Sequence, residues 1–166
     1  QRVFLSGWDA FFNLYSGSRG SGKSFALCLW IAARAAVAGT RVGLYRMNYS
    51  DLVSSTLITL LEGDDEDPIL PPGSYTHNQQ KHRIDIHGGG TILYGGFDKG
   101  IQAKEMGGTG SKSSMNLTCA AIDEAVEVPE SLVTQLTGSI RMKHPTIPNP
   151  LAMACNPGPP AHYLAR

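Results

Sequence analysis

Residues 17–24 of the chain, Gly-Ser-Arg-Gly-Ser-Gly-Lys-Ser, match the Walker A pattern Gly-x-x-x-x-Gly-Lys-[Ser/Thr]. The apolar run Phe11 to Ser16 leads directly into them, and the Ala- and Leu-rich stretch Lys23 to Ala38 follows without Gly or Pro. This order predicts a buried strand, a glycine loop and a helix that Gly39 terminates. Glycines let the backbone N–H groups of the loop point inward, and the helix adds its positive end, so the segment suits nucleotide phosphates.

Each residue of this loop is a candidate for nucleotide binding. Lys23 would reach the β- and γ-phosphates, and the Ser24 hydroxyl would bind Mg²⁺. Arg19 could stabilise transition-state charge within its own chain, although an exposed arginine paired with an acid is the alternative. The predicted nucleotide-binding residues of the loop are Gly17, Ser18, Arg19, Gly20, Ser21, Gly22, Lys23 and Ser24.

An acidic pair follows a second apolar run, Leu117 to Asp123, which reads as a buried strand. Asp123 fits Walker B, an acid at a strand end that holds Mg²⁺. Glu124 would orient or deprotonate the attacking water, a function that small-molecule kinases do not need. An Asp-Glu pair alone is more often a helix start, but after an apolar strand in a chain with a P-loop it predicts catalysis.

The last apolar run, Leu151 to Cys155, ends at Asn156. An amide at this position could bond the γ-phosphate or the attacking water and thereby sense the nucleotide state. The alternative is an ordinary turn residue, because Asn-Pro commonly begins turns.

The remaining segments complete an alternation of strands and helices. Gly88 to Gly90 predict a hairpin turn between two strands. Strands that are apolar throughout and separated by helices predict an α/β fold, a mainly parallel sheet with helices on both faces, here a P-loop NTPase of the ASCE type. The further predicted elements are strands at Arg41 to Arg46, Arg83 to His87 and Thr91 to Phe97, a helix capped by Ser50 or Asp51 and running to about Glu62, and a helix near Pro129 to Thr137.

The carboxyl ends of parallel strands are where ligands collect in such sheets. Gly17 to Ser24, Asp123 with Glu124, and Asn156 all follow predicted strands. We therefore expect one site that contains the loop, the acidic pair and the amide.

The composition limits the other possibilities. A length of 166 residues fits a single domain, residues 1–166, and the start at Gln1 suggests a piece of a longer chain. The formal net charge is zero, so any DNA contact must be local. No apolar run is long enough for a membrane span. The three cysteines, Cys28, Cys119 and Cys155, are far apart in apolar runs and are expected to be reduced core residues.

As a set, these residues resemble the ATPase domain of the large terminase subunit, the DNA-packaging motor of tailed bacteriophages. The loop with Arg19, Ile122 to Ala125 and Asn156-Pro157 followed by His162-Tyr163 are similar to that family's motifs. Arg46 at a strand end and Gly95-Gly96 after a strand fit as well. By this resemblance, Gln1 would read adenine upstream of the loop.

The resemblance implies an ATP-hydrolysing motor that moves viral double-stranded DNA into a procapsid. Its implied partners are the DNA, the portal of the procapsid and the small terminase subunit, in the cytoplasm of the bacterial host during virion assembly. A homo-oligomeric ring is implied for the assembled motor, whereas the isolated piece could be a monomer. The family's nuclease domain is not seen in this sequence.

The resemblance leaves open which residue of one subunit would act on the nucleotide site of its neighbour. In some members an activating arginine lies in the region that corresponds to Lys99 to Ser114, which has none here. Lys104, Lys112 and Arg141 remain candidates, each more simply explained as solvated charge. Two other classes of function stay open: another ASCE-type ATPase such as a helicase core, and a nucleotide-gated assembly module without turnover.

Overall fold

The computed structural model describes residues 10–63, 67–98 and 116–165 and contains one seven-stranded sheet of order β1-β7-β6-β2-β5-β4-β3. The neighbouring strands from β1 to β5 in this order are parallel, and β4 and β3 are added antiparallel. This confirms the predicted α/β fold with a mainly parallel sheet. The strands are β1 (Phe12–Ser16), β2 (Arg41–Arg46), β3 (Tyr75–Asn78), β4 (Arg83–Ile86), β5 (Thr91–Gly96), β6 (Cys119–Ile122) and β7 (Leu151–Cys155).

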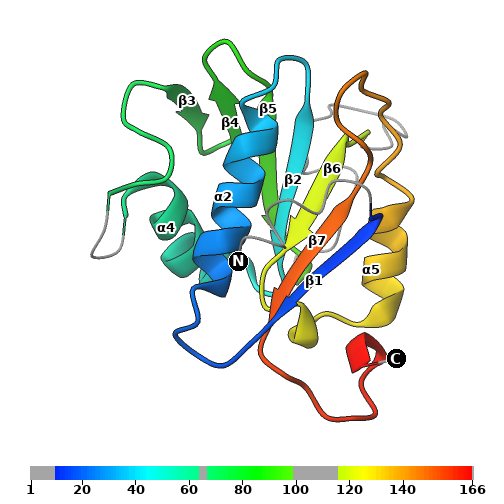
Figure 1. Ribbon diagram of the computed structural model, residues 1–166. Helices are drawn as coiled ribbons and strands as arrows, with labels where there is room; N and C mark the ends of the chain where they lie inside the picture. The colour runs from blue at the N-terminus through cyan, green and yellow to red at the C-terminus, as the bar shows by residue number, and fades with distance from the viewer. Residues whose placement is uncertain (1–9, 64–66, 99–115, 166) are drawn as a thin grey trace.

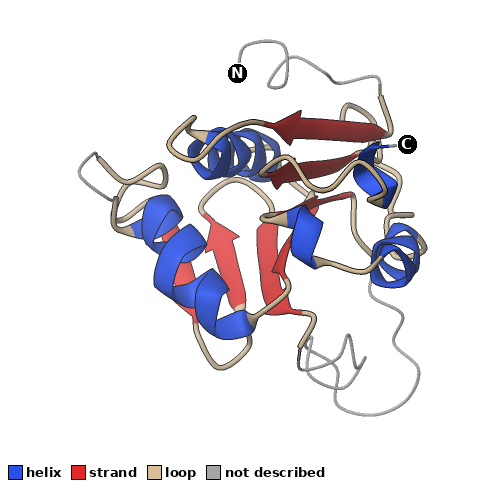
Figure 2. Cartoon of the chain, turned by 90° about the horizontal axis from the view of Figure 1, so that it is seen from below, coloured by secondary structure: helices blue, strands red, loops and turns tan. Residues whose placement is uncertain are grey.

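Helices cover both faces of the sheet (Figures 1 and 2). On β7, Ala152 and Ala154 face the cluster that contains the buried side of α2, whereas Leu151, Met153 and Cys155 face the cluster that contains α5. This alternation explains why the strand is apolar at every position. The helical segments are α2 (Lys23–Ala35), α3 (Tyr49–Asp51), the π-helix η1 (Leu52–Thr56), α4 (Leu57–Leu61), the 3₁₀ helix η2 (Ala125–Glu127), α5 (Glu130–Thr137) and the 3₁₀ helix η3 (Tyr163–Ala165).

Strand β1 differs from its prediction because it lies at the edge of the sheet. In the part of the chain that the structure describes, it pairs with β7 alone. The Phe12 side chain is 55% exposed and that of Leu14 is 42% exposed. The prediction of a buried strand was therefore wrong in burial, although its position was right, because apolar composition does not reveal which strand lacks a second neighbour.

Helix α2 also ends earlier than predicted, at Ala35 instead of Ala38. The Thr40 hydroxyl lies 2.9 Å from the carbonyl oxygen of Arg34 and 2.8 Å from that of Val37. These contacts satisfy carbonyls that the next helical turn would have used. Gly39 does adopt a positive φ of 82°, but within the following turn.

The helix predicted to start at Ser50 or Asp51 begins at Tyr49 and contains a π-helical stretch. Neither predicted side chain caps it. Instead, the Tyr49 N–H donates to Asp98 Oδ1, just beyond β5, at 3.2 Å. Strand β3 was not predicted, because Tyr75–Asn78 has no continuous apolar run. The predicted hairpin of β4 and β5 is confirmed.

Candidate nucleotide site

The carboxyl ends of β1, β7 and β6 lie side by side (Figure 1) and bring the predicted site segments together. Ser16 pairs with Cys155, and Ile122 pairs with Met153. Because β7 lies between the other two strands, Asn156 lies between the glycine loop and the acidic pair in the order of the sheet.

The glycine loop joins β1 to α2 and needs its glycines for different reasons. Gly20 and Gly22 have φ values of 74° and 72°, which side chains disfavour. Gly17 donates its N–H to the Cys155 carbonyl at 3.3 Å, and a Cβ at Gly17 would lie 2.8 Å from Ser21 Oγ. Gly22 precedes α2 without a side-chain cap, so the first N–H groups of the helix point toward the loop and can receive an anion.

The two cations of the loop lie in different surroundings. Lys23 is 7% exposed, and its Nζ donates to the Ser18 carbonyl at 2.7 Å and lies 3.5 Å from Ser21 Oγ. The lysine thus folds over its own loop. Arg19 is exposed, and its guanidinium has no hydrogen-bond or ion-pair partner within the described ranges, so the alternative of an acid-paired arginine is not seen there.

Asp123 is the centre of a buried network of oxygens. Its side chain is 1% exposed and accepts at Oδ1 from Ser24 Oγ and from the Glu124 N–H, both at 3.1 Å. Its Oδ2 accepts from the Thr56 hydroxyl at 2.7 Å. A serine hydroxyl beside a carboxylate is a donor set that suits Mg²⁺, which prefers oxygen ligands.

Thr56 is a residue that the sequence reasoning missed. It belongs to η1 and is fully buried. The available signal was a hydroxyl among leucines on the inward side of the predicted helix, because Leu52, Leu57 and Leu60 are buried with it. A buried hydroxyl needs a partner.

Glu124 combines backbone strain with a side-chain contact. Its φ and ψ are 49° and 49°, a left-handed conformation that costs a non-glycine residue about 1–3 kcal/mol. Its Oε2 accepts from Asn156 Nδ2 at 3.3 Å, whereas Asn156 Oδ1 is buried without a partner in the described structure. The predicted sensor therefore touches the predicted base directly.

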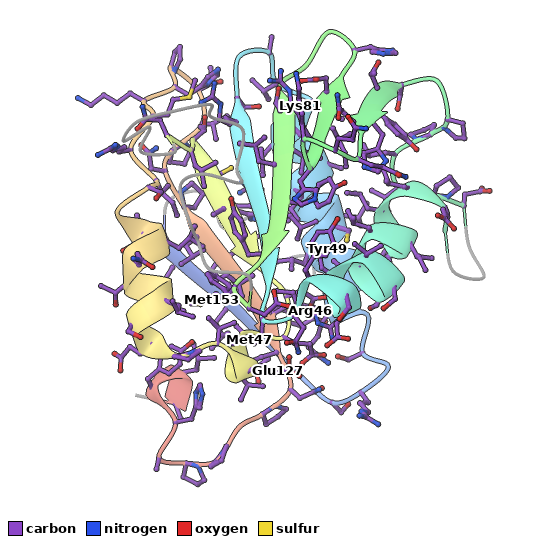
Figure 3. The ribbon with its side chains drawn as sticks, turned by 180° about the vertical axis from the view of Figure 1, so that it is seen from behind. Arg46, Met47, Tyr49, Lys81, Glu127 and Met153 are labelled. Carbon is purple, nitrogen blue, oxygen red and sulfur yellow. The ribbon has the colours of Figure 1, made fainter. Side chains whose placement is uncertain are left out.

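Arg46 is the last residue of β2 and lies at the same end of the sheet (Figure 3). It contacts the Asp51 carbonyl at 3.4 Å and Ser55 Oγ at 3.2 Å, and its Nε is buried with no partner among the described residues.

The second glycine of the Gly95-Gly96 pair allows the helical segment to approach the sheet at this end. A Cβ at Gly96 would lie 2.4 Å from the Tyr49 nitrogen and 2.7 Å from its Cα. If residue 96 had a side chain, the first residue of α3 could therefore not keep its position.

Several other predicted residues are not at the site. Arg141 lies at the opposite end of β6, where its Nε donates to Asn116 Oδ1 at 2.6 Å. Gln1, Lys104 and Lys112 lie outside the described residues. The cysteines are buried, and burial raises the pKa of the Cys119 thiol to about 12, in keeping with core packing. No helix in the described ranges has the length and apolar character of a membrane span.

The glycine loop between β1 and α2, on a parallel sheet with an acidic strand end nearby, defines the class as the P-loop nucleoside triphosphatase fold. A family model described as phage terminase large subunit matches residues 9–166, so the chain belongs to this family. No curated protein sequence matches the chain.

Solved structures of large terminases share the fold. The large terminase of a thermophilic bacteriophage, in complex with ATP-gamma-S, superposes with a TM-score of 0.68 at 17% identity, over 99% of this chain and 39% of that one. Another crystal form of the same terminase gives 0.70 at 16% identity, over 99% and 40%. The HK97 bacteriophage large terminase gives 0.61 at 12% identity, over 94% and 31%. The chain thus spans about two fifths or less of these relatives.

Proposed function

We propose that this chain is the ATP-hydrolysing motor domain of a large terminase and powers the movement of viral double-stranded DNA into a procapsid. The observation that carries this proposal is the chain of contacts from the P-loop to the acidic pair and the amide. Ser24 contacts Asp123, the Glu124 backbone N–H contacts Asp123, and the Glu124 side chain contacts Asn156.

The binding step follows from the geometry of the glycine loop. Its positive-φ glycines and the uncapped start of α2 direct backbone N–H groups toward an anion. The Lys23 ammonium would exchange its contact with the Ser18 carbonyl for the β- and γ-phosphate oxygens. A large terminase of the same fold has been solved with ATP-gamma-S, which supports a nucleotide in this loop.

The residues at the metal position fit Mg²⁺ by their chemistry. The Ser24 hydroxyl and the Asp123 carboxylate would hold the ion, and bound Mg²⁺ would neutralise charge on the phosphate oxygens. The protein contributes a buried, fixed carboxylate at this point.

Hydrolysis needs a group that takes or orients the proton of water. Glu124 is the candidate, and it contacts Asn156. In the proposal the Asn156 amide bonds either this base or the nucleotide. In this proposal a water molecule bound to the γ-phosphate donates to Asn156 Oδ1, and Asn156 then releases Glu124. The base and the sensor therefore respond to the same nucleotide. Arg19, exposed in the loop, would add positive charge to the transition state.

The wider role rests on the family, because this chain covers only part of the relatives' length. The partners in the proposal are double-stranded DNA, the portal of the procapsid and the small terminase subunit, in the host cytoplasm during assembly. Activity in a ring of identical subunits completes the proposal. Its trans-acting residue is not assigned, because the contact of Arg141 is with Asn116 of its own chain and Lys104 and Lys112 lie outside the described residues.

Phosphate release by the purified protein tests the proposal. Glu124→Gln keeps size and hydrogen bonding but removes the base, so turnover should fall by about 10²-fold or more while ATP binding persists. Unchanged turnover would assign the base elsewhere. A wild-type protein that binds ATP without any phosphate release, alone or with DNA and procapsids, would favour the non-hydrolysing assembly module.

The motor part of the proposal has a separate test, which is turnover per subunit against protein concentration. Rates that rise with concentration or with procapsids support a ring, since an arginine supplied in trans raises the rate about 10³- to 10⁵-fold. A fast rate in a proven monomer, independent of concentration, would contradict it, and Arg19 would then be the residue to mutate.

A further inference from the structure

A buried hydroxyl outside the recognised motifs contacts the Walker B carboxylate. Thr56 is fully buried at the end of the π-helix η1, and its Oγ1 donates to Asp123 Oδ2 at 2.7 Å. Asp123 Oδ1 takes the other two contacts, from Ser24 and from the Glu124 N–H. The only donor to Oδ2 in the described part of the chain is therefore Thr56.

The Thr56 hydroxyl has a different kind of hydrogen-bond acceptor from the hydroxyls of Thr59 and Thr134, which also lie in helices. Thr59 donates to the Ser55 carbonyl at 3.3 Å and Thr134 to the Glu130 carbonyl at 3.0 Å, the usual back-bonding to a residue four positions earlier. Thr56 donates instead to a strand end 67 residues away in the sequence. Such a contact restrains the Asp123 carboxylate, whereas back-bonding would join the hydroxyl to a carbonyl of its own helix.

The π-helical turn accompanies this arrangement. The Leu57 N–H donates to the Leu52 carbonyl, five residues earlier, which adds one residue to the turn that ends with Thr56. Single π-turns inside α-helices occur frequently at functional sites. The Thr56 carbonyl accepts from Cys28 Sγ of α2 at 3.6 Å, so both polar groups of Thr56 join η1 to the elements of the nucleotide site.

The segment is anchored on its other side as well. Arg46 at the end of β2 contacts the Asp51 carbonyl and Ser55 Oγ, next to Thr56. The segment that carries Thr56 is thus held by Arg46 on one side and by the Asp123 contact on the other, which a positioning group requires.

We propose that Thr56 is a positioning residue that fixes the Asp123 carboxylate with Oδ1 toward Ser24. This inference rests on the proposed function, in which Ser24 and Asp123 hold the Mg²⁺ of the nucleotide. When Oδ1 and Ser24 serve the ion, Thr56 keeps Oδ2 bonded and limits rotation of the carboxylate. Groups that orient a metal ligand in this way typically change metal affinity by about 10- to 100-fold when removed.

The test is the Mg²⁺ dependence of ATP-gamma-S binding by calorimetry, which does not require turnover. Thr56→Val keeps the shape and removes the hydroxyl, so the Mg²⁺ concentration for half-maximal effect should rise about 10-fold. Binding without Mg²⁺ should stay at the wild-type level, and Thr56→Ser should restore the Mg²⁺ response. Thr59→Val, in the same helical segment, is the matched control and should bind as wild type does.

A second measurement separates positioning from a general loss of structure. In an Asp123→Asn background, Thr56→Val should add little to the Mg²⁺ defect, because the effect acts through that carboxylate. Additive defects, or a wild-type Mg²⁺ response in Thr56→Val, would overturn the inference. Thr56→Ala compared with Thr56→Ser gives the same decision if the valine variant does not fold.

The result also distinguishes this inference from the proposed function. A wild-type protein whose nucleotide binding ignores Mg²⁺, or which never releases phosphate, contradicts the proposed function. Wild-type binding that depends on Mg²⁺, together with a Thr56→Val protein that behaves identically, contradicts the positioning role alone.

Discussion

The carboxyl end of the parallel strands and the hairpin side of the sheet differ in how fully their polar groups are hydrogen-bonded. On the hairpin side, defined as β3, β4, the two turns that follow them, and Thr91 and Tyr94 of the adjoining strand β5, the polar groups bond to one another. Asp85 accepts from Arg83 at 2.6 Å and from Thr91 at 2.8 Å, and the ring of His77 lies 2.8 Å from the Tyr94 hydroxyl. These groups leave little unused bonding capacity for a ligand.

At the carboxyl end, polar atoms are buried without partners. Arg46 Nε and Asn156 Oδ1 are both of this kind within the described structure, whereas no side-chain atom of β3 or β4 is. An unsatisfied buried polar atom costs about 1–3 kcal/mol. This difference supports the proposal that a ligand completes the contacts at the carboxyl end and that the hairpin side is scaffold.

Replacing one lysine in each region by alanine should give the largest difference in Mg-ATP affinity. Lys23→Ala removes the ammonium that folds over the loop, and Mg-ATP affinity should fall by about 10- to 100-fold, the scale of charged hydrogen bonds. Lys81→Ala removes an exposed cation on the hairpin side and should leave affinity unchanged. Calorimetry with both variants decides, and equal affinities would contradict the P-loop assignment.

Two glycines in nearly identical conformations offer a more closely matched comparison. Gly20 in the loop and Gly88 in the hairpin turn both have a φ of 74°, and a Cβ on either would meet nothing within 4 Å. Alanine at either position should lower the free energy of unfolding by about 1–2 kcal/mol. Nucleotide affinity should fall only for Gly20→Ala, and a similar loss for Gly88→Ala would remove the distinction between the regions.

The two non-glycine residues with positive φ allow a smaller test of strain. Asn tolerates this conformation better than Glu or His, so Glu124→Asn should raise the free energy of unfolding by up to about 1 kcal/mol. His82→Asn should gain less, because the His82 ring stacks on Tyr49 at 4.8 Å. Urea denaturation measures both. Only Glu124→Asn should lose turnover. A Glu124→Asn protein no more stable than wild type would argue against strain at this position, and a fully active one would argue against catalysis there.

The fold and the members of the site were predictable to different degrees. Strands that are apolar throughout, such as β7, showed the parallel sheet, because a strand covered on both faces has no polar side. The glycine loop was predicted from the fixed spacing of its residues, and the acidic pair from its place directly after an apolar strand. Each of these signals is local in the sequence.

Other features depend on contacts between distant residues and leave no local pattern. The exposure of β1 depends on which strands become neighbours, and the contact between Thr56 and Asp123 joins residues 67 positions apart. The contact of Asn156 with Glu124 is also of this kind. The cap of α3 by Asp98 was missed because a side chain from another element replaced the local one.

The smallest expected effect concerns the ion pair on the hairpin side. The hydrogen bond from Arg83 lowers the pKa of Asp85, and both side chains are partly exposed, at 46% and 40%. A carboxyl whose pKa is lower in the folded state contributes stability above its unfolded pKa, and this contribution is lost as the pH falls through the folded pKa. Asp85→Asn should therefore cost under about 1 kcal/mol at pH 7, because solvent screens exposed pairs.

The pH dependence distinguishes this pair from the nucleotide site. The difference in stability between wild type and Asp85→Asn should be constant at neutral pH and shrink below about pH 4, the ordinary range of an aspartate. ATP turnover at pH 7 should be the same in both proteins, because the hairpin pair does not contact the P-loop strands. Thermal denaturation from pH 3 to pH 7 and phosphate release measure the two effects. If Asp85→Asn lowered turnover more than stability, the hairpin side would belong to the functional machinery, and the division of the sheet into scaffold and site would be wrong.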